Sequence, residues 1–353
     1  AWFSLISLYL LLCYFALSQE WGLDFASYYG SSHALAIGHS PYQSFKDFFL
    51  DIRLSPSPNP PLTLLLFSIF SEFDYPVAFT LWLVFSTSLG GVAALKGFRL
   101  LFNQAFYERY RMTMLLLYLA AFPVLMNTIM LQWGGVLLYL FIEGYAGYLK
   151  QDLRKTRSVA LKIGSQCSCT TVYTALEQRE HRVGFFWGLL IALKLFPGLL
   201  LIYVLLKRQY RIAFWMLIWT IAFSAMPLFW VDSDLYYQYV HFISQGIPWY
   251  GVNWNISLRG FLFRCLVVLK KQPGLNAYTT VSGVLLATRL YHLGALLTLC
   301  AWIFSFKRLE QRSLYRGMSF LIVLMFFLSP MGWLYYGPLL LLPLGYTFCS
   351  GLR

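Results

Sequence analysis

Asp24 is a lone carboxylate directly after the first apolar run of the chain, within the stretch WGLDFASYYGSSHALAIGHSPYQ. An isolated carboxylate can accept a proton from an attacking hydroxyl that comes within hydrogen-bond reach. Aspartate is also a favoured capping residue at the start of a helix, and a helix is expected to continue from Asp24. The two interpretations are compatible, so Asp24 is a candidate general base as well as a helix cap.

Three basic side chains stand among apolar residues or beside them, where an ionisable group is costly and therefore a candidate for function. Lys194 lies within LLIALKLFPGLLL, and Arg259 and Arg264 flank GFLF in NWNISLRGFLFR. Such cations suit a phosphate group, although Lys194 could also extend to a membrane interface and Arg264 could meet lipid headgroups. A spacing of five does not place both arginines on one helical face, so both need not serve one ligand. Arg259 is the better candidate for a phosphate or substrate.

The remaining polar candidates give weaker signals. Gln132, in LQWGG, can bond a ligand hydroxyl or stabilise the turn in which it stands. Cys167-x-Cys169 lacks the spacing of a metal site, and no pair of carboxylates or histidines requires a divalent metal. We therefore identify no cofactor and leave a metal requirement open. No G-x-G-x-x-G, P-loop or G-x-S-x-G sequence is present, which argues against nucleotide binding and serine hydrolysis.

The composition indicates a membrane protein built from helices. Hydrophobic residues make up 59% of the chain and charged residues only 12%, against about 25% charged in soluble domains. Apolar runs near membrane-spanning length recur throughout. The net charge of +13 could indicate a nucleic-acid partner. Because the basic residues lie in short loops between apolar runs, we expect membrane lipids as partners and no nucleic acid.

We expect one transmembrane domain over residues 1–353, an all-α bundle of about ten short helices. Its first external loop, residues 19–75, contains interfacial helices, one of which begins at Pro60 and Pro61 because proline is tolerated in a first turn. A cytoplasmic loop covers residues 150–183 and an external segment covers residues 231–282. The expected membrane segments are residues 2–17, 77–95, 112–126, 133–149, 184–206 (broken at KLFPG), 212–230, 284–306, 318–328 and 336–348.

The distribution of basic residues predicts the orientation. On this layout most of the 27 lysines and arginines lie on one side of the membrane, and that side is the cytoplasm by the positive-inside rule. Both termini are then cytoplasmic, and Asp24 lies on the outer face. The break at KLFPG allows two half-length helices to return to the same side, and broken helices of this kind line cavities.

The order of six segments resembles family 87 of the GT-C glycosyltransferases, the polyprenyl-phosphate-mannose-dependent type. They are GLDFASYYGSSHALAIGHSPYQ, NPPLTLLLFSIFS, LQWGGVLLYL, GLLIALKLFPGLLLIYVLLKRQYRIA, NWNISLRGFLFR and LSPMGWLYYGPLLLL. Each segment alone is a weak signal, but all six in this order are fairly specific for the family. They are much less specific for the substrate.

The resemblance implies a GT-C-like fold and the transfer of a sugar, with mannose as the family default, to an acceptor hydroxyl on a glycolipid or glycan. The donor is a lipid-linked sugar phosphate and the transfer proceeds with inversion. Asp24 matches the family's general base. Lys194, Arg259 and Arg264 match its donor-phosphate ligands, and Gln132 matches a residue implied to contact acceptor or sugar. The aromatic side chains Tyr28, Trp333 and Tyr335 can stack on sugar rings, although aromatic residues are also typical of membrane interfaces. The family also implies a bacterial inner membrane with the active site facing the periplasm.

The chain departs from the family pattern at two motifs and in an unusual insert, residues 150–182. A last motif that often reads W-x-H is Trp333-Leu334-Tyr335 here, and the glycine expected before Gln132 is Leu131. Two alternatives remain open. A broken helix with a buried lysine also occurs in transporters of lipids or solutes. A catalytically degenerate subunit of an assembly with other membrane proteins would explain the altered motif.

Overall fold

The computed structural model describes residues 2–18, 24–43, 56–161, 169–244, 251, 254–271, 278–310 and 314–351. These residues form a helical protein with one antiparallel hairpin, β1 (Val268–Lys271) with β2 (Tyr278–Ser282). The helices are α1 (Trp2–Ser18), α2 (Asp24–Ala36), α3 (Pro61–Ser71), α4 (Tyr75–Leu101), α5 (Gln104–Ala120), α6 (Phe122–Met130), α7 (Gly134–Leu161), α8 (Cys169–Leu193), η2 (Phe196–Gly198), α9 (Leu199–Leu206), α10 (Tyr210–Ala225), η3 (Met226–Phe229), α11 (Asp234–Ser244), α12 (Leu258–Leu266), α13 (Val284–Glu310), α14 (Leu314–Leu328), η5 (Leu334–Leu340) and α15 (Leu341–Gly351).

Fewer helices are long enough to cross a membrane than the sequence suggests. Within the described residues, α4, the α10–η3 unit and α13 are long and apolar enough. The pair α5 and α6, bent by 56° at its junction, would make a fourth span. The expected number of about ten spans is therefore not confirmed. Several apolar runs, such as α3 and α14, fold into helices of 10–17 residues, which are shorter than the ~20 residues that a span needs.

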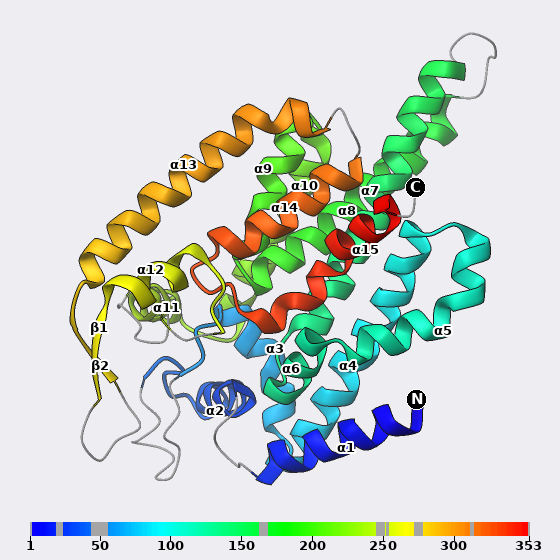
Figure 1. The fold of residues 1–353 in the computed structure, drawn as a ribbon. Coiled ribbons are helices and arrows are strands. Elements are labelled where there is room, and N and C mark those ends of the chain that lie inside the picture. Colours follow the sequence, from blue (N-terminus) through cyan, green and yellow to red (C-terminus); the bar gives the residue numbers. More distant parts are fainter. Residues whose placement is uncertain are drawn as a thin grey trace.

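The two ends of the molecule carry different elements (Figure 1). α2, α11, α12 and the hairpin gather at one end, whereas α7 and α8 project together from the opposite end. The loop expected over residues 150–183 is instead largely helical, because α7 continues to Leu161 and α8 already begins at Cys169. Residues 162–168, between them, lie outside the described part of the chain. The flanking stretches contain no proline, so polar residues can continue a helix beyond its apolar part.

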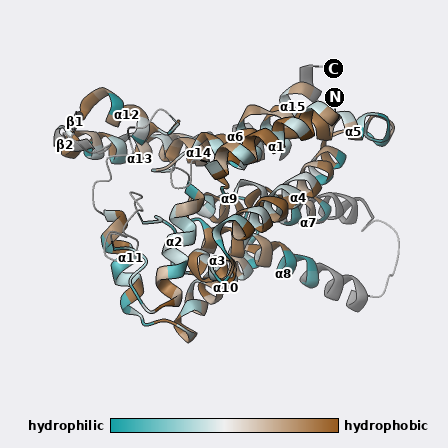
Figure 2. Cartoon of the chain, turned by 90° about the horizontal axis from the view of Figure 1, so that it is seen from below, coloured by the Kyte–Doolittle hydropathy of each residue, from teal (hydrophilic) through white to brown (hydrophobic). Residues whose placement is uncertain are grey.

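α7 forms the centre of the bundle, where it packs against α4 and α8. Gly135 allows the close approach to α4, since a Cβ at this position would come within 2.1 Å of the Ser86 carbonyl oxygen. The buried ring of Trp82 packs against Trp133 just before α7, with ring centres 4.6 Å apart, and buried Trp187 of α8 lies against Gly144 further along α7. Hydrophobic residues also cover outward faces of α4, α10 and α14 (Figure 2), as expected for helices in contact with lipid.

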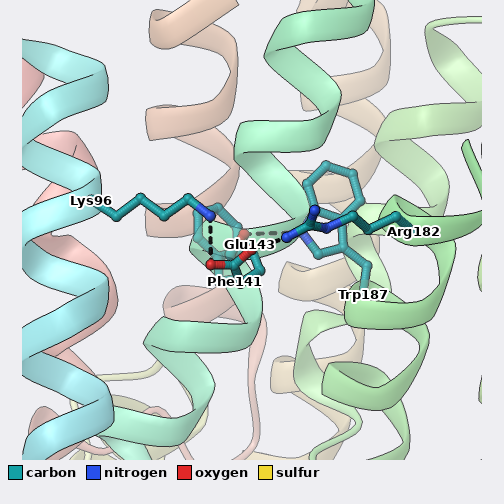
Figure 3. A network of polar contacts seen from close by, with 5 residues as sticks. All are labelled: Lys96, Phe141, Glu143, Arg182 and Trp187. Atoms are coloured by element: carbon teal, nitrogen blue, oxygen red, sulfur yellow. Dashed lines mark hydrogen bonds and ion pairs between the residues drawn. The ribbon is translucent and has the colours of Figure 1, made fainter. Parts of the chain in front are cut away.

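An ion triad joins α4, α7 and α8 (Figure 3). Glu143 of α7, whose side chain is only 8% exposed, accepts hydrogen bonds from Lys96 at 2.5 Å and from Arg182 at 2.8 Å. Two residues before Glu143, the Phe141 carbonyl accepts a hydrogen bond from the Trp187 indole at 3.2 Å. The nine residues between the start of α7 and Glu143 span about 14 Å of helix. The triad therefore fixes the three helices well away from the turn that precedes α7.

The break predicted at KLFPG is present in the structure. α8 ends at Leu193, and the 3-10 turn η2 contains Pro197, which cannot donate a backbone hydrogen bond. Thr63 of α3 donates its hydroxyl to the Leu193 carbonyl at 2.8 Å, so a carbonyl that the break leaves without a helical partner is satisfied. The break is thus attached to α3, and Lys194 follows it directly.

Candidate active site

A cavity of about 830 Å³ lies among α2, the α6–α7 turn, the α8–η2 break, α11, α12, α13 and the segment before η5. It is formed by the same end of the molecule that carries α2, α11 and α12 in Figure 1. Its walls combine a few polar groups with many apolar ones. The lining residues are Asp24, Ser27, Tyr28, Ser57, Pro58, Pro60, Met130, Gln132, Lys194, Leu195, Phe196, Tyr239, Val240, Ile243, Ser244, Trp254, Arg259, Thr288, His292, Ser329, Pro330, Met331, Trp333, Tyr335 and Tyr336.

Seven of the eight site residues named from the sequence line this one cavity. They are Asp24, Tyr28, Gln132, Lys194, Arg259, Trp333 and Tyr335. Arg264 is the exception: it is not among the lining residues, and its guanidinium donates to the Asn255 carbonyl at 2.9 Å. Because α12 turns by about 100° per residue, the five-residue spacing directs Arg259 and Arg264 to different partners.

Asp24 is the first residue of α2, and its carboxylate is held by two hydrogen-bond donors. The Gln132 side-chain amide donates to Oδ2, and the Tyr335 hydroxyl also donates to the carboxylate. Burial raises the pKa of Asp24, while these two donors and the positive charge of Lys194 oppose the shift. A carboxylate with a raised pKa is a stronger base once ionised, which suits proton abstraction near neutral pH.

Gln132 is positioned by a turn with an unusual backbone. Leu131 adopts a left-handed conformation, with φ 48° and ψ 47°, which favours glycine over residues with a side chain. A glycine before Gln132 would adopt this conformation more easily, and in this chain leucine adopts it. The Trp82 indole donates to the Leu131 carbonyl at 2.9 Å, and the Gln132 amide donates to the Asn127 carbonyl at 3.0 Å. These contacts hold the turn in place, which a strained left-handed residue such as Leu131 requires.

Lys194 extends into the cavity from the helix break. Its ammonium donates to the Asn59 side-chain oxygen and lies 5.8 Å from the ring centre of Tyr28 and 5.3 Å from that of Tyr336. Burial lowers the pKa of Lys194 to about 7, against the opposing attraction of Asp24. Lys194 and Asp24 both lie outside the helices that are long enough to span a membrane. An ammonium with these surroundings can act as a point charge for an anionic ligand group.

Arg259 reaches the cavity from the first turn of α12. This helix begins at Ser257, whose side chain accepts from the Gly260 amide at 3.1 Å and thereby caps it. The guanidinium lies 5.6 Å from the ring centre of Phe263 and 5.5 Å from that of Tyr291. Aromatic faces on these two residues orient the cation without neutralising its charge.

The segment that carries Trp333 and Tyr335 is attached to the start of α12 through Asn255. The Asn255 side chain accepts from the Gly332 amide at 3.1 Å and donates to the Pro330 carbonyl at 3.1 Å. The rings of Trp333 and Tyr335 stack with centres 5.5 Å apart. Gly134 allows the Tyr335 backbone to approach α7, since a Cβ there would lie 2.9 Å from the Tyr335 carbonyl oxygen.

Several residues of the cavity have no counterpart among the candidates named from the sequence. Tyr336 and His292 are two of them, and Asn59, which does not line the cavity but accepts a hydrogen bond from Lys194, was not named either. Asn59 stands in SPSPNPP, which reads as a turn, and Tyr336 is adjacent to Tyr335 in an aromatic segment. The spacing of these residues gives no signal, because each acquires its partner only through the fold. Among the described residues, no group of three or more histidines, cysteines, aspartates or glutamates could hold a metal ion.

The helices that are long and apolar enough to cross a bilayer, together with a cavity at one end of the bundle, define the class of the protein: a helical membrane protein. A sequence model of glycosyltransferase family 87 matches residues 58–330. The match covers more than half of the chain, which therefore belongs to glycosyltransferase family 87 of the GT-C superfamily and is a membrane glycosyltransferase.

The range matched by the family model contains some of the cavity residues but not all of them. Gln132, Lys194 and Arg259 fall within residues 58–330. Asp24 lies before this range and Tyr335 after it, so they join the other three through the geometry of the cavity. No curated protein and no solved structure shows significant similarity to the chain.

Proposed function

We propose that this glycosyltransferase moves a sugar, with mannose as the first candidate, from a polyprenyl-phosphate donor to an acceptor hydroxyl on a glycolipid or glycan. One observation carries the proposal: a carboxylate and two cations, Asp24, Lys194 and Arg259, line a single cavity in a helical membrane protein. A transferase needs a base for the acceptor and positive charge for the departing phosphate. The cavity provides both.

Asp24 is the general base of the proposed reaction. As the acceptor oxygen attacks the anomeric carbon, the carboxylate takes its proton. The bond between the anomeric carbon and the phosphate oxygen breaks, and polyprenyl phosphate leaves with the electron pair. Attack from the face opposite to the phosphate inverts the configuration at the anomeric carbon. Gln132 and Tyr335 hold the carboxylate through their hydrogen bonds.

Lys194 and Arg259 stabilise the negative charge that develops on the departing phosphate. Preorganised cations in a site shielded from water lower the barrier because they need no reorientation during the reaction. Apolar residues beside them, including Leu195, Phe196 and Ile243, suit the isoprenoid chain of the donor. Tyr28, Trp333 and Tyr335 offer aromatic faces for the two sugar rings.

The proposal includes an orientation in the membrane. The cavity faces the periplasm of a bacterial inner membrane, and the projecting ends of α7 and α8 lie in the cytoplasm with both termini. The positive-inside rule supports this placement, since Lys96, Arg109 and Lys150 all lie away from the cavity end.

Transfer of radiolabelled mannose from synthetic polyprenyl-phosphate-mannose to a membrane glycolipid extract tests the function. The assay compares purified wild type with Asp24→Asn, which removes the charge but keeps the shape. General-base catalysis contributes typically a factor of 10² to 10⁴, so we expect the variant to lose at least about 100-fold in rate. Labelled product with wild type alone supports Asp24 as the base.

Asp74→Asn is the matched control, because Asp74 is an exposed aspartate just before α4 and does not line the cavity. It should transfer at the wild-type rate, and thermal unfolding in detergent should show that both variants fold. Near-normal turnover by Asp24→Asn would reject the base assignment. No transfer by folded wild type with mannose, glucose or pentose donors would reject the proposed function in favour of a non-catalytic subunit.

A further inference from the structure

We propose that Asn59 is a positioning residue for Lys194: its neutral side-chain oxygen directs the ammonium into the cavity and leaves the positive charge available for the donor phosphate. This inference rests on the proposed function, because it assigns a task to the cation that the reaction requires. Asn59 precedes α3 and is fully buried. It is not itself among the residues that line the cavity.

Every polar group of the Asn59 side chain has a partner. The oxygen Oδ1 accepts from the Lys194 ammonium, and the nitrogen Nδ2 donates to Ser57 Oγ. The side chain also forms a hydrogen bond with the Tyr28 hydroxyl. A buried amide that is satisfied on both sides cannot turn over without breaking its hydrogen bonds, so Oδ1 stays directed at Lys194.

Asn59 also connects the cation to the base. The Tyr28 hydroxyl donates to Gln132, and the Gln132 amide donates to Asp24. A continuous series of hydrogen-bonded side chains therefore runs from Lys194 to Asp24 through neutral groups. Such a series fixes the separation of the two charged groups while preventing them from forming a direct ion pair.

The backbone around Asn59 is held on both sides. Pro60 follows it, and the residue before a proline is restricted to extended conformations. The Asn59 backbone carbonyl accepts a hydrogen bond from the Tyr42 hydroxyl at 2.8 Å. The Ser57 amide donates to Ser31 Oγ at 3.0 Å. Together with the bond from Thr63 to the break after α8, these contacts place Asn59 and Lys194 in a fixed relation.

An amide, rather than a carboxylate, is the chemically important feature of this position. A carboxylate at residue 59 would form a buried ion pair with Lys194, and the pair would compete with an incoming phosphate. An amide oxygen accepts the same hydrogen bond but carries no net charge. The titratable groups that share the cavity region with Lys194 are Asp24, Tyr28, Tyr239, Arg259, His292, Tyr335 and Tyr336.

Binding of a polyprenyl phosphate without a sugar is the direct test, because it does not require transfer. We expect Asn59→Asp, which is nearly isosteric, to weaken this binding by about tenfold or more, as the loss of one charge partner typically costs at least about 1.4 kcal/mol. In the transfer assay the donor KM should rise more than kcat falls. The alkaline limb of kcat/KM should move to higher pH, because the new carboxylate favours protonated Lys194.

Asn59→Ala should shift the alkaline limb of kcat/KM in the opposite direction, and this variant replaces Asn59→Asp if the aspartate variant does not fold. Removal of the oxygen withdraws a hydrogen bond from the charged ammonium, so the alkaline limb should move to lower pH. Asn103→Asp is the matched control, since Asn103 caps α5 outside the cavity and aspartate caps equally well. It should bind polyprenyl phosphate as wild type does.

A double variant separates a role through Lys194 from a general structural role. In a Lys194→Gln background, Asn59→Asp should cause little further loss of polyprenyl-phosphate binding. Equal losses in both backgrounds, or wild-type binding and an unshifted alkaline limb in Asn59→Asp, would overturn the inference while leaving the transferase intact. Weaker binding by Asn59→Asp in a protein that never transfers would reject the proposed function and retain the inference. A wild type that binds no polyprenyl phosphate would reject both.

Discussion

Asp24 and Lys194 carry opposite charges within one buried cavity, and burial moves their pKa values toward each other. The raised pKa of Asp24 means that the carboxyl remains protonated, and cannot act as a base, up to a higher pH than usual. The lowered pKa of Lys194, about 7, means that the ammonium is lost above neutral pH. In the proposed mechanism, the active form therefore exists above the pKa of Asp24 and below the pKa of Lys194.

This pair predicts a narrow, bell-shaped dependence of kcat/KM on pH, which reports the groups of the unliganded enzyme. The rate should rise as Asp24 loses its proton and fall as Lys194 loses its own near pH 7. In Lys194→Arg the guanidinium stays charged, so the falling limb should move to well above pH 9. Measurement of kcat/KM for the donor across pH 4 to 10 checks this. A falling limb that is unchanged in Lys194→Arg would assign it to another group.

At the scale of single residues, the sequence identified candidates by type but could not identify their partners. Seven candidates share the cavity, and the side-chain chemistry of each was visible from the chain alone. Asn59 was missed because its role depends on Lys194, which is far away in the sequence. Arg264 had the right chemistry, yet the rotation of α12 directs it to a backbone carbonyl.

The helix break and the ion triad define how the elements hold the cavity in place. The break was predictable because a proline inside an apolar run interrupts a helix, and because a continuous crossing would place a basic loop on each side of the membrane. The helical ends of α7 and α8 were not, because hydropathy separates apolar from polar segments and a polar helix outside the membrane has the same hydropathy as a loop. The triad at Glu143 joins these two helices to α4.

The triad predicts how much stability the protein loses when the Glu143 charge is removed. In Glu143→Gln the buried carboxylate no longer pairs with Lys96 and Arg182. The side chains of the two cations are 33% and 60% exposed, so water can solvate them in the variant. The loss in free energy of unfolding should therefore be about 1–2 kcal/mol, below the 3–5 kcal/mol expected when a fully buried pair is broken. Thermal unfolding in detergent measures this as a lower Tm, with kcat/KM at low temperature unchanged.

Glu108→Gln is the matched comparison, since Glu108 pairs with Arg111 at 3.6 Å on an exposed surface. Exposed pairs contribute about 0–1 kcal/mol, so its Tm should remain close to that of wild type. Equal Tm values for the two variants would show that the triad does not contribute more than a surface ion pair.

The whole molecule has two chemically different ends, and the proposed orientation assigns them to opposite sides of the membrane. Cys265 of α12 is exposed at the cavity end, whereas Glu108 of α5 belongs to a basic segment away from it. A maleimide that cannot cross membranes should label Cys265 in cells with an opened outer membrane, and Cys265→Ser should lose this signal. Glu108→Cys, in the Cys265→Ser background, should react only after the inner membrane is permeabilised.

The reverse pattern of labelling would place the cavity in the cytoplasm.

Composition alone was sufficient to predict a helical membrane protein, and the order of motifs was sufficient to predict the family. The number of spans could not be obtained in this way, because an apolar run of a given length can form a crossing helix, a short helix or part of a bent pair.

The hydrogen bond from Tyr335 to Asp24 joins segments from opposite parts of the chain, and it has a consequence for biosynthesis. Membrane helices are inserted in the order in which they are translated. A nascent chain that has not yet reached η5 holds Asp24 without one of its two donors, and one that has not reached the break after α8 also lacks Lys194. Premature release from the ribosome should therefore yield a protein that occupies the membrane with the proposed active site incomplete.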